Sequence, residues 1–277
     1  MNNTEARNPN TMDIDKKTTR EMLTLIQAEN YNSVKAIEAA IPSIEAACDQ
    51  ITQRMKKGGR LIYIGAGTSG RLGVADAAEC PPTYGVSPEM VSGIVAGGFE
   101  RMFSAGESTE DDGKKGEDDL RQKALTSFDS VLGISAAGNA AYVADALAYA
   151  RSIGCLTIGL TCNANSRLAR ESDISILTDT GAEVIQGSTR MKAGNAHKMV
   201  LNMISTCIMV KLGYVYQNMM INLKPMNAKL TARMIHIVSD IMKCTENEAR
   251  ELLSKCDWSI RECIQRAKPK NDKSNQM

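Results

Sequence analysis

Five short apolar runs rich in β-branched residues restrict the fold of this chain more than any other feature of its sequence. Each run is bounded by glycine or polar residues, and they occupy positions 61–64, 94–96, 131–134, 156–160 and 174–177. Such runs are typical of strands buried on both faces of a parallel sheet. Segments with helical character lie between them, at 71–79, 118–125, 140–152 and 166–170. The alternation predicts an α/β fold, a doubly wound parallel sheet of about five strands with right-handed crossovers.

The segments that flank this series predict further parts of the chain. Residues 1–17 are polar, and their few apolar side chains could not order them alone, so we expect a flexible arm. A capping box of Thr18 and Glu21 opens one or two helices that extend to residue 57, and a long apolar helix is expected at 190–212. Beyond Pro225, three short helices are expected at 226–243, 246–255 and 259–267. The predicted organisation is a main domain at 18–225, a helical bundle at 226–268 and a tail at 269–277.

The composition excludes several classes of function. The chain has 33 Lys and Arg against 32 Asp and Glu, a net charge of +1, which provides no general attraction to nucleic acid or to an anionic membrane. Its eight cysteines form no CxxC pair and only two histidines accompany them, so we expect reduced thiols and no metal site. The most apolar stretch, at 199–210, is interrupted by polar residues, and no signal peptide is recognisable. A cytoplasmic protein is therefore expected.

A glycine-rich turn follows the first predicted strand. Residues 65–71 read Gly-Ala-Gly-Thr-Ser-Gly-Arg and match the pattern GxGxxG. A dinucleotide site would need an acidic residue at the end of the second strand, where residues 97–98 are both glycine. The hydroxyls of Thr68 and Ser69, the backbone N–H groups near Gly67 and Gly70, and the helix dipole favour one compact sugar phosphate instead. The alternative is a turn that serves only tight packing of strand against helix.

Two later turns occupy corresponding positions after predicted strands. Ser135 and Gly138 follow the third strand, at the sheet edge where loops converge on a ligand. After the fifth strand, Ser188 and Thr189 are candidate N-cap residues of the long helix, and Arg190 and Lys192 are cations in its first turn, where the helix dipole disfavours positive charge. That placement indicates an anionic partner, either a bound ligand or the carboxylate of an ion pair.

Acidic residues at two places are candidates for catalysis. Glu79 is expected to end the helix after the glycine turn, where a carboxylate is electrostatically disfavoured. Glu107 and Glu110 lie in an acidic stretch at 106–113, which is either a solvated loop or the start of a helix. From the sequence alone, none of the three is distinguished from an ordinary surface carboxylate.

These segments together resemble the N-acetylmuramic acid 6-phosphate etherases. The resemblance is strongest at residues 61–73, 78–86, 187–194 and 201–206, and it includes the arm at 4–9 and the C-terminal bundle, so it covers nearly the whole chain. It implies a sugar isomerase (SIS) domain, which is a parallel α/β sandwich, followed by a small three-helix bundle similar to ubiquitin-associated (UBA) domains. It also implies a homodimer with sites near the subunit interface.

The implied reaction cleaves the lactyl ether of N-acetylmuramic acid 6-phosphate with water, which gives N-acetylglucosamine 6-phosphate and D-lactate in cell-wall sugar recycling. In the open-chain sugar the C1 aldehyde acidifies the C2 proton, so a general base removes this proton while a general acid protonates the departing oxygen at C3. Water then adds to the unsaturated aldehyde, and no metal or redox cofactor is required. By motif position, Glu79 is the acid, Glu110 the base and Glu107 a sugar ligand.

The chain departs from the usual family pattern in the loop after the third strand. Where the family has Ser-Gly-Arg-Thr-Pro, residues 137–141 are Ala-Gly-Asn-Ala-Ala, which removes two hydroxyls and a cation expected near the phosphate. Ser135, at the start of the loop, is the donor that could compensate. The glycine turn, Glu79 and Glu110 are retained.

Other functions are compatible with parts of this pattern. A non-catalytic sugar-phosphate sensor resembling the glucokinase regulatory protein shares the motifs, although that relative has two SIS domains and this chain shows one. A phosphosugar isomerase would need a similar base at C2 but no acid at a C3 ether oxygen. A transcription factor with a SIS domain would need a basic helix-turn-helix before residue 55, where charges of both signs are mixed.

Overall fold

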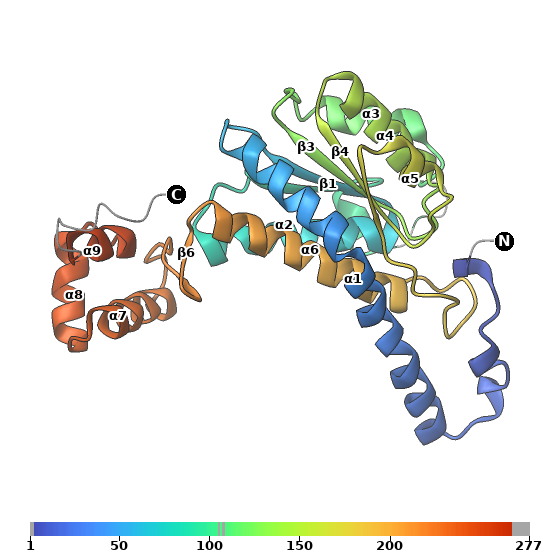
Figure 1. The fold of residues 1–277 in the computed structure, drawn as a ribbon, viewed down its shortest axis with the longest axis horizontal. Coiled ribbons are helices and arrows are strands. Elements are labelled where there is room, and N and C mark those ends of the chain that lie inside the picture. The colour runs from blue at the N-terminus through green and yellow to red at the C-terminus, as the bar shows by residue number, and fades with distance from the viewer. Residues whose placement is uncertain (1–2, 105, 107–108, 268–277) are drawn as a thin grey trace. The chain divides into compact units, whose positions relative to one another are not determined.

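The computed structural model describes residues 3–104, 106 and 109–267, and its main element is a parallel five-stranded sheet (Figure 1). The strand order is β2-β1-β3-β4-β5, with β1 at Leu61–Gly65, β2 at Val91–Val95, β3 at Ser130–Ile134, β4 at Leu156–Thr161 and β5 at Ile174–Leu177. The predicted α/β fold is therefore confirmed. Strand β2 begins three residues before the predicted range of 94–96 and ends one residue before its end. Gly97 and Gly98, which follow it, adopt positive φ angles of 82° and 76°, which a strand cannot accommodate.

Helices cover both faces of the sheet (Figure 1). Ile62 and Ile64 of β1 point toward α4 (Ala141–Ser152) and share an apolar core with its Tyr142, on the face that α3 (Gly113–Arg121) and α5 (Arg167–Glu171) also cover. Tyr63 points to the opposite face, where its hydroxyl donates to Asp76 of α2 (Gly67–Tyr84) at 3.0 Å. Helices α1 (Thr19–Met55) and α6 (Lys192–Lys211) lie on that second face. The alternation along β1 separates the two cores, as a pleated strand requires.

The capping box that was predicted before α1 is present. Glu21 N–H donates to the Thr18 hydroxyl, Thr18 N–H donates to the Glu21 carboxylate, and one helix then continues for 37 residues. Helix α2 begins within the glycine turn and continues to Tyr84, with two prolines in its last turn and Gly85, at a φ of +62°, after it. The prediction that this helix ends at Glu79 was wrong, so the argument from the helix C-terminus does not apply to that carboxylate.

The N-terminal arm has a defined course. Three short 3-10 helices occupy Asn3–Glu5, Pro9–Thr11 and Ile14–Lys16. Side chains of Asn3, Asn8 and Thr11 donate hydrogen bonds to residues 179–184, which follow β5. The composition of a segment indicates only how much apolar surface that segment could bury by itself. It could not predict these hydrogen bonds, because their acceptors lie far away in the sequence.

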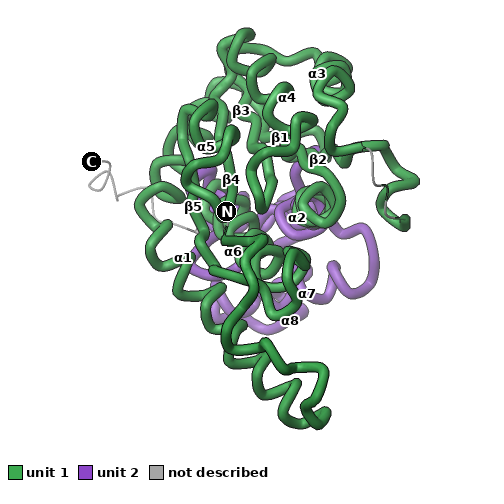
Figure 2. The backbone as a smooth tube through the Cα atoms, turned by 90° about the vertical axis from the view of Figure 1, so that its right-hand side faces the viewer, with its two compact units in different colours: residues 1–78, 88–208 green, residues 79–87, 209–277 purple. Residues whose placement is uncertain are grey.

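The chain divides into two compact units, Met1–Ala78 with Pro88–Ile208, and Glu79–Ser87 with Met209–Met277 (Figure 2). The second unit contains a short hairpin of β6 (Val215–Tyr216) and β7 (Met219–Met220) and the helices α7 (Ala228–Met242), α8 (Glu246–Lys255) and α9 (Ile260–Ala267). The division falls before the predicted boundary at 225, because Ile221 and Leu223 pack in the same core as the three helices. No helix in the described part of the chain is long and apolar enough to cross a bilayer.

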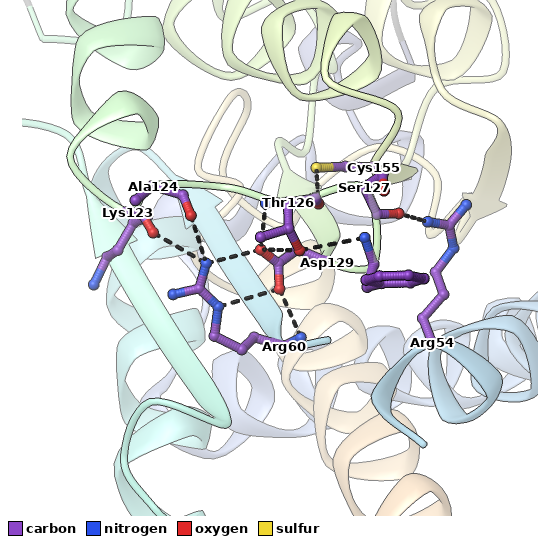
Figure 3. A network of polar contacts seen from close by, with 9 residues as sticks. Arg54, Arg60, Lys123, Ala124, Thr126, Ser127, Asp129 and Cys155 are labelled. Atoms are coloured by element: carbon purple, nitrogen blue, oxygen red, sulfur yellow. Dashed lines mark hydrogen bonds and ion pairs between the residues drawn. The ribbon is translucent and has the colours of Figure 1, made fainter. Parts of the chain in front are cut away.

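A polar network fixes the amino ends of β1 and β3 (Figure 3). Asp129, which is 1% exposed, accepts hydrogen bonds from the backbone N–H of Arg60 at 2.8 Å, from its guanidinium at 2.8 and 3.1 Å, and from Thr126 N–H at 2.8 Å. Arg60 also donates to the carbonyls of Lys123 and Ala124. These contacts place the structural polar network at the amino ends of the strands and leave the carboxyl ends for a ligand.

Candidate functional site

A pocket of about 290 Å³ lies at the carboxyl ends of β1 and β3. Its walls are the β1–α2 turn at 66–69, the β3–α4 loop with Ser135, two residues before α6 and two within its first turns, while Glu5 and Glu110 contribute carboxylates. Of the predicted site residues, Gly67, Thr68, Ser69, Ser135 and Glu110 all line this one pocket. The sheet edge at which parallel α/β folds bind ligands is thus where the predicted residues converge.

The β1–α2 turn places the start of a helix at the pocket. Gly67 has a φ of +53°, and α2 begins there, so that its first turn presents N–H groups beside the hydroxyls of Thr68 and Ser69. Gly70 does not line the pocket. A Cβ at Gly70 would lie 2.3 Å from the Gly65 carbonyl oxygen, so this glycine permits the close approach of strand and helix.

The β3–α4 loop contributes Ser135, which is 9% exposed. The Ser135 hydroxyl accepts a hydrogen bond from Gly138 N–H at 3.1 Å, which leaves its own O–H group as a donor. Gly138, at a φ of +74°, packs against Ser166 and is outside the pocket lining. Ala137 and Ala140 line the pocket with methyl groups where a hydroxyl or a cation could otherwise project.

The segment that enters α6 presents other residues to the pocket than Ser188 and Lys192. Gly187 and Thr189 line the pocket, whereas Ser188 between them does not. Lys192 is 1% exposed, and its ammonium group pairs with the Glu29 carboxylate of α1. The anionic partner predicted for this cation is therefore a buried residue of the protein.

The amino end of α6 has a carboxylate of its own. Both oxygens of Glu183, which is fully buried, accept hydrogen bonds from the first N–H groups of the helix, at 3.1 Å from Lys192 and 3.0 Å from Ala193. A negative charge in this position is stabilised by the helix dipole. The α6 terminus is thereby occupied by the protein itself, and the α2 terminus is the one that faces the pocket.

The acidic candidates have different positions. Glu110 lines the pocket, and its carbonyl accepts a hydrogen bond from Tyr142 N–H at 3.0 Å, which ties this loop to α4. Glu79 is an exposed residue of α2 and belongs to the second compact unit. Glu107 lies outside the described residues.

A buried histidine completes the pocket wall. His197 is 1% exposed, and its Nε2 lies 3.5 Å from the Cys162 sulfur. Burial lowers the pKa of His197 to about 4 and raises the pKa of Cys162 to about 11, so both groups are neutral near pH 7. Among the residues described, the lining contains two carboxylates and no Lys or Arg, and an anion would have to be held by neutral donors and the α2 dipole.

Sequence reasoning did not assign Glu5, Thr189 or His197 to the site. Glu5 was assigned to the arm, and nothing in its local sequence indicates that residues 179–186 hold it in place. Thr189 neighbours the predicted Ser188, and a one-residue difference in the turn decides which of them faces the pocket. His197 had a weak signal, since it is one of only two histidines in the chain and lies five residues after Lys192 in the predicted helix.

Comparisons with known proteins agree with this fold. Three family models match the chain, the glucokinase regulatory protein N-terminal SIS domain at residues 43–151, the SIS domain at 114–205, and the C-terminal lid domain of glucokinase regulatory protein at 217–272. The phosphoheptose isomerase structure from Francisella tularensis superposes with a TM-score of 0.52 at 14% identity and covers 69% of this chain and 98% of its own. At that identity it supports the SIS fold alone.

Two relatives are similar along nearly their whole length. The N-acetylmuramic acid 6-phosphate etherase of Caldanaerobacter subterraneus subsp. tengcongensis is 51% identical over 261 residues, which are 94% of this chain and 85% of the relative. The protein of the same name from Bacillus subtilis is 47% identical over 269 residues, which are 97% of this chain and 88% of the relative. Both matches extend over the SIS domain and the C-terminal unit.

Proposed function

We propose that this chain, which belongs to the N-acetylmuramic acid 6-phosphate etherase family, cleaves the lactyl ether of N-acetylmuramic acid 6-phosphate to N-acetylglucosamine 6-phosphate and D-lactate. The reaction is an elimination followed by addition of water, so the enzyme is a carbon–oxygen lyase. The observation that supports this most is the common pocket of Glu110, the α2 terminus and three hydroxyl side chains, Thr68, Ser69 and Ser135. A base and an anion site in one pocket are two of the features that the reaction requires.

In the proposed mechanism, Glu110 removes the C2 proton of the open-chain sugar. The electron pair of the C2–H bond forms the C2–C3 double bond, and the C3–O bond breaks as Glu79 gives its proton to the lactyl oxygen. In the second half, the ionised Glu79 takes a proton from the water whose oxygen bonds to C3, and Glu110 returns its proton to C2, which consumes the double bond. Glu107 is assigned as a sugar ligand. The carboxylates exchange only protons, so no oxidant or metal enters the balance.

We assign the phosphate to the amino end of α2. The hydroxyls of Thr68, Ser69 and Ser135 are its donors there, with the N–H groups of the first helical turn. Gly70 and Gly138 act by permitting close packing of the turns, and Lys192 acts by holding the segment that enters α6 through its ion pair with Glu29.

The remaining features of the proposed function follow from the family. We propose a homodimer with its sites near the subunit interface, a cytoplasmic location and a role in the recycling of peptidoglycan sugars. Its partner is then a small amino-sugar phosphate, with no nucleic acid or membrane involved. In the second unit, the helices α7, α8 and α9 are proposed to form a UBA-like bundle.

The test is D-lactate release from N-acetylmuramic acid 6-phosphate by the purified protein, beside the variants Glu79→Gln and Glu110→Gln. We expect release by the wild type and a loss of kcat by about 100-fold or more in each variant, since general acid–base groups contribute about 10²–10⁴-fold. Binding of the sugar phosphate without any release of lactate would refute the etherase and favour the sensor. Full activity of Glu110→Gln would refute the assignment of the base.

A further inference from the structure

We infer that Glu5 of the N-terminal arm is a specificity-determining residue, whose carboxylate accepts a hydrogen bond from a hydroxyl or the acetamido N–H of the sugar. The inference deepens the proposed function and rests on it for the identity of the ligand. Glu5 is the last residue of the first 3-10 helix, and its side chain lines the same pocket as Glu110.

Hydrogen bonds hold the arm beside the segment that leads to the pocket. Asn3 Nδ2 donates to Asp179 Oδ2 at 3.0 Å, and the Gln186 side-chain amide donates to the Glu5 carbonyl at 2.9 Å, so Glu5 is fixed from both sides. Further along, Asn8 Nδ2 donates to Ala182 O at 3.0 Å and the Thr11 hydroxyl to Val184 O at 2.8 Å. Each partner lies within 179–186, immediately before Gly187 of the pocket wall.

A buried ion pair contacts the middle of the arm. Asn10 Nδ2 donates to Glu29 Oε1 at 2.9 Å, and the second oxygen of Glu29 accepts from the Lys192 ammonium. Burial alone would raise the pKa of Glu29, but hydrogen bonds from Lys192, Asn10 and Asn8 hold it below its ordinary value, so this carboxylate is ionised near pH 7. The arm is thus connected to α1 and to the first turn of α6.

Gly187 makes room for the Glu5 carboxylate. A Cβ at Gly187, whose φ is +75°, would lie 3.3 Å from Glu5 Oε2, so a side chain there would compete with Glu5 for the pocket wall. Within the described part of the chain, the Glu5 carboxylate makes no hydrogen bond and no ion pair. Its two oxygens are therefore free to accept from a ligand.

The chemistry of the lining decides what Glu5 can bind. A carboxylate accepts hydrogen bonds and repels a phosphate or the lactyl carboxylate, whereas the α2 terminus donates hydrogen bonds and attracts an anion. The ligand is then oriented with its phosphate at α2 and a hydroxyl or amide donor at Glu5. Among sugar phosphates, those with a donor in that position are selected.

The experiment compares Glu5→Ala and Glu5→Gln with the wild type and with Asp15→Asn, which neutralises an exposed acid of the same arm outside the pocket. Steady-state release of D-lactate gives kcat and KM, and calorimetry gives the Kd of N-acetylglucosamine 6-phosphate without turnover. We expect Glu5→Ala to raise both KM and Kd by roughly tenfold or more, the effect of losing a hydrogen bond to a charged group, with kcat within about twofold. Glu5→Gln keeps an acceptor oxygen and should lose less, and Asp15→Asn should match the wild type.

Wild-type KM and Kd in Glu5→Ala, with the variant folded as shown by an unchanged thermal unfolding temperature, would overturn the inference and leave the etherase function intact. A wild type that releases no lactate, but binds N-acetylglucosamine 6-phosphate more tightly than Glu5→Ala does, would refute the etherase and support Glu5 as a ligand residue. If the wild type neither binds this sugar phosphate nor releases lactate, both proposals are wrong.

Discussion

Replacement of Lys192 by methionine distinguishes a structural role of this residue from a role in ligand binding. The side chains of Lys192 and Glu29 are 1% and 7% exposed, so water screens their attraction very little. Removal of one partner from a buried ion pair leaves the other charge without compensation and costs about 3–5 kcal/mol. Asn10 still donates to Glu29 in the variant, and we therefore expect a loss near the lower limit, about 3 kcal/mol.

The loss should depend on pH with a defined sign. In the folded protein, burial raises the pKa of Glu29. The hydrogen bonds from Lys192 and Asn10 lower it by more, so that the net pKa lies below the ordinary value. A lowered pKa adds stability that is present above the unfolded value of about 4.3 and disappears as the pH falls through the folded value. In Lys192→Met, protonation of Glu29 removes the uncompensated charge. The difference from the wild type should therefore be largest near pH 7 and become smaller toward about pH 4.

Urea unfolding, followed by circular dichroism at both pH values, measures these differences. The matched control is the double variant Glu29→Gln with Lys192→Met, which removes both charges and should be more stable than Lys192→Met alone. If Lys192→Met unfolds within about 1 kcal/mol of the wild type, while its affinity for N-acetylglucosamine 6-phosphate falls tenfold, then Lys192 is a ligand residue and our placement of it is refuted.

Two further variants test the sheet and the pocket. Asp129→Asn should lower the free energy of unfolding by about 2 kcal/mol at pH 7, because Arg60 is 29% exposed and its charge is partly screened. Burial raises the pKa of Asp129, but the interactions with Arg60 and Thr126 outweigh it and lower this pKa. The difference in stability between variant and wild type, measured by urea unfolding, should therefore disappear as the pH falls below about 4. Ser135→Ala should weaken the binding of N-acetylglucosamine 6-phosphate about fivefold in calorimetry, the effect of one neutral hydrogen bond, and an unchanged Kd would exclude this hydroxyl as a donor.

The sheet could be predicted from the sequence because its information is local. Each strand is a β-branched run ended by glycine or a polar residue, and burial on both faces requires no knowledge of its neighbours. The strand order β2-β1-β3-β4-β5 could not be predicted, since it depends on which strand each crossover connection places beside which other strand. The start of α1 was also local, because Thr18 and Glu21 are three residues apart and cap each other.

The site was predictable only where it is built from single turns. The β1–α2 turn and Ser135 follow strands whose ends must meet at one edge, so their convergence could be expected. The partner of Lys192 could not be identified, because Glu29 is 163 residues away in the sequence. A cation in the first helical turn predicted only that this partner is negatively charged. The contacts of the arm could not be predicted for the same reason, since its hydrogen-bond partners lie at residues 179–186.

The composition of the pocket limits how strongly it can hold a phosphate alone. With no Lys or Arg among the described lining residues, the attraction comes from the α2 dipole, worth up to about 2 kcal/mol, and from the three hydroxyls assigned to the phosphate, those of Thr68, Ser69 and Ser135, at about 1 kcal/mol each. Together these give about 5 kcal/mol, a Kd of roughly 0.2 mM before the entropy of association is subtracted. Inorganic phosphate should then bind only in the millimolar range. Any tighter binding of an amino-sugar phosphate must come from contacts to the sugar, and Glu5 and Glu110 are the charged residues of the described lining that can make them. Through Glu5, the arm then contributes to the affinity for the ligand as well as to the selection among sugar phosphates.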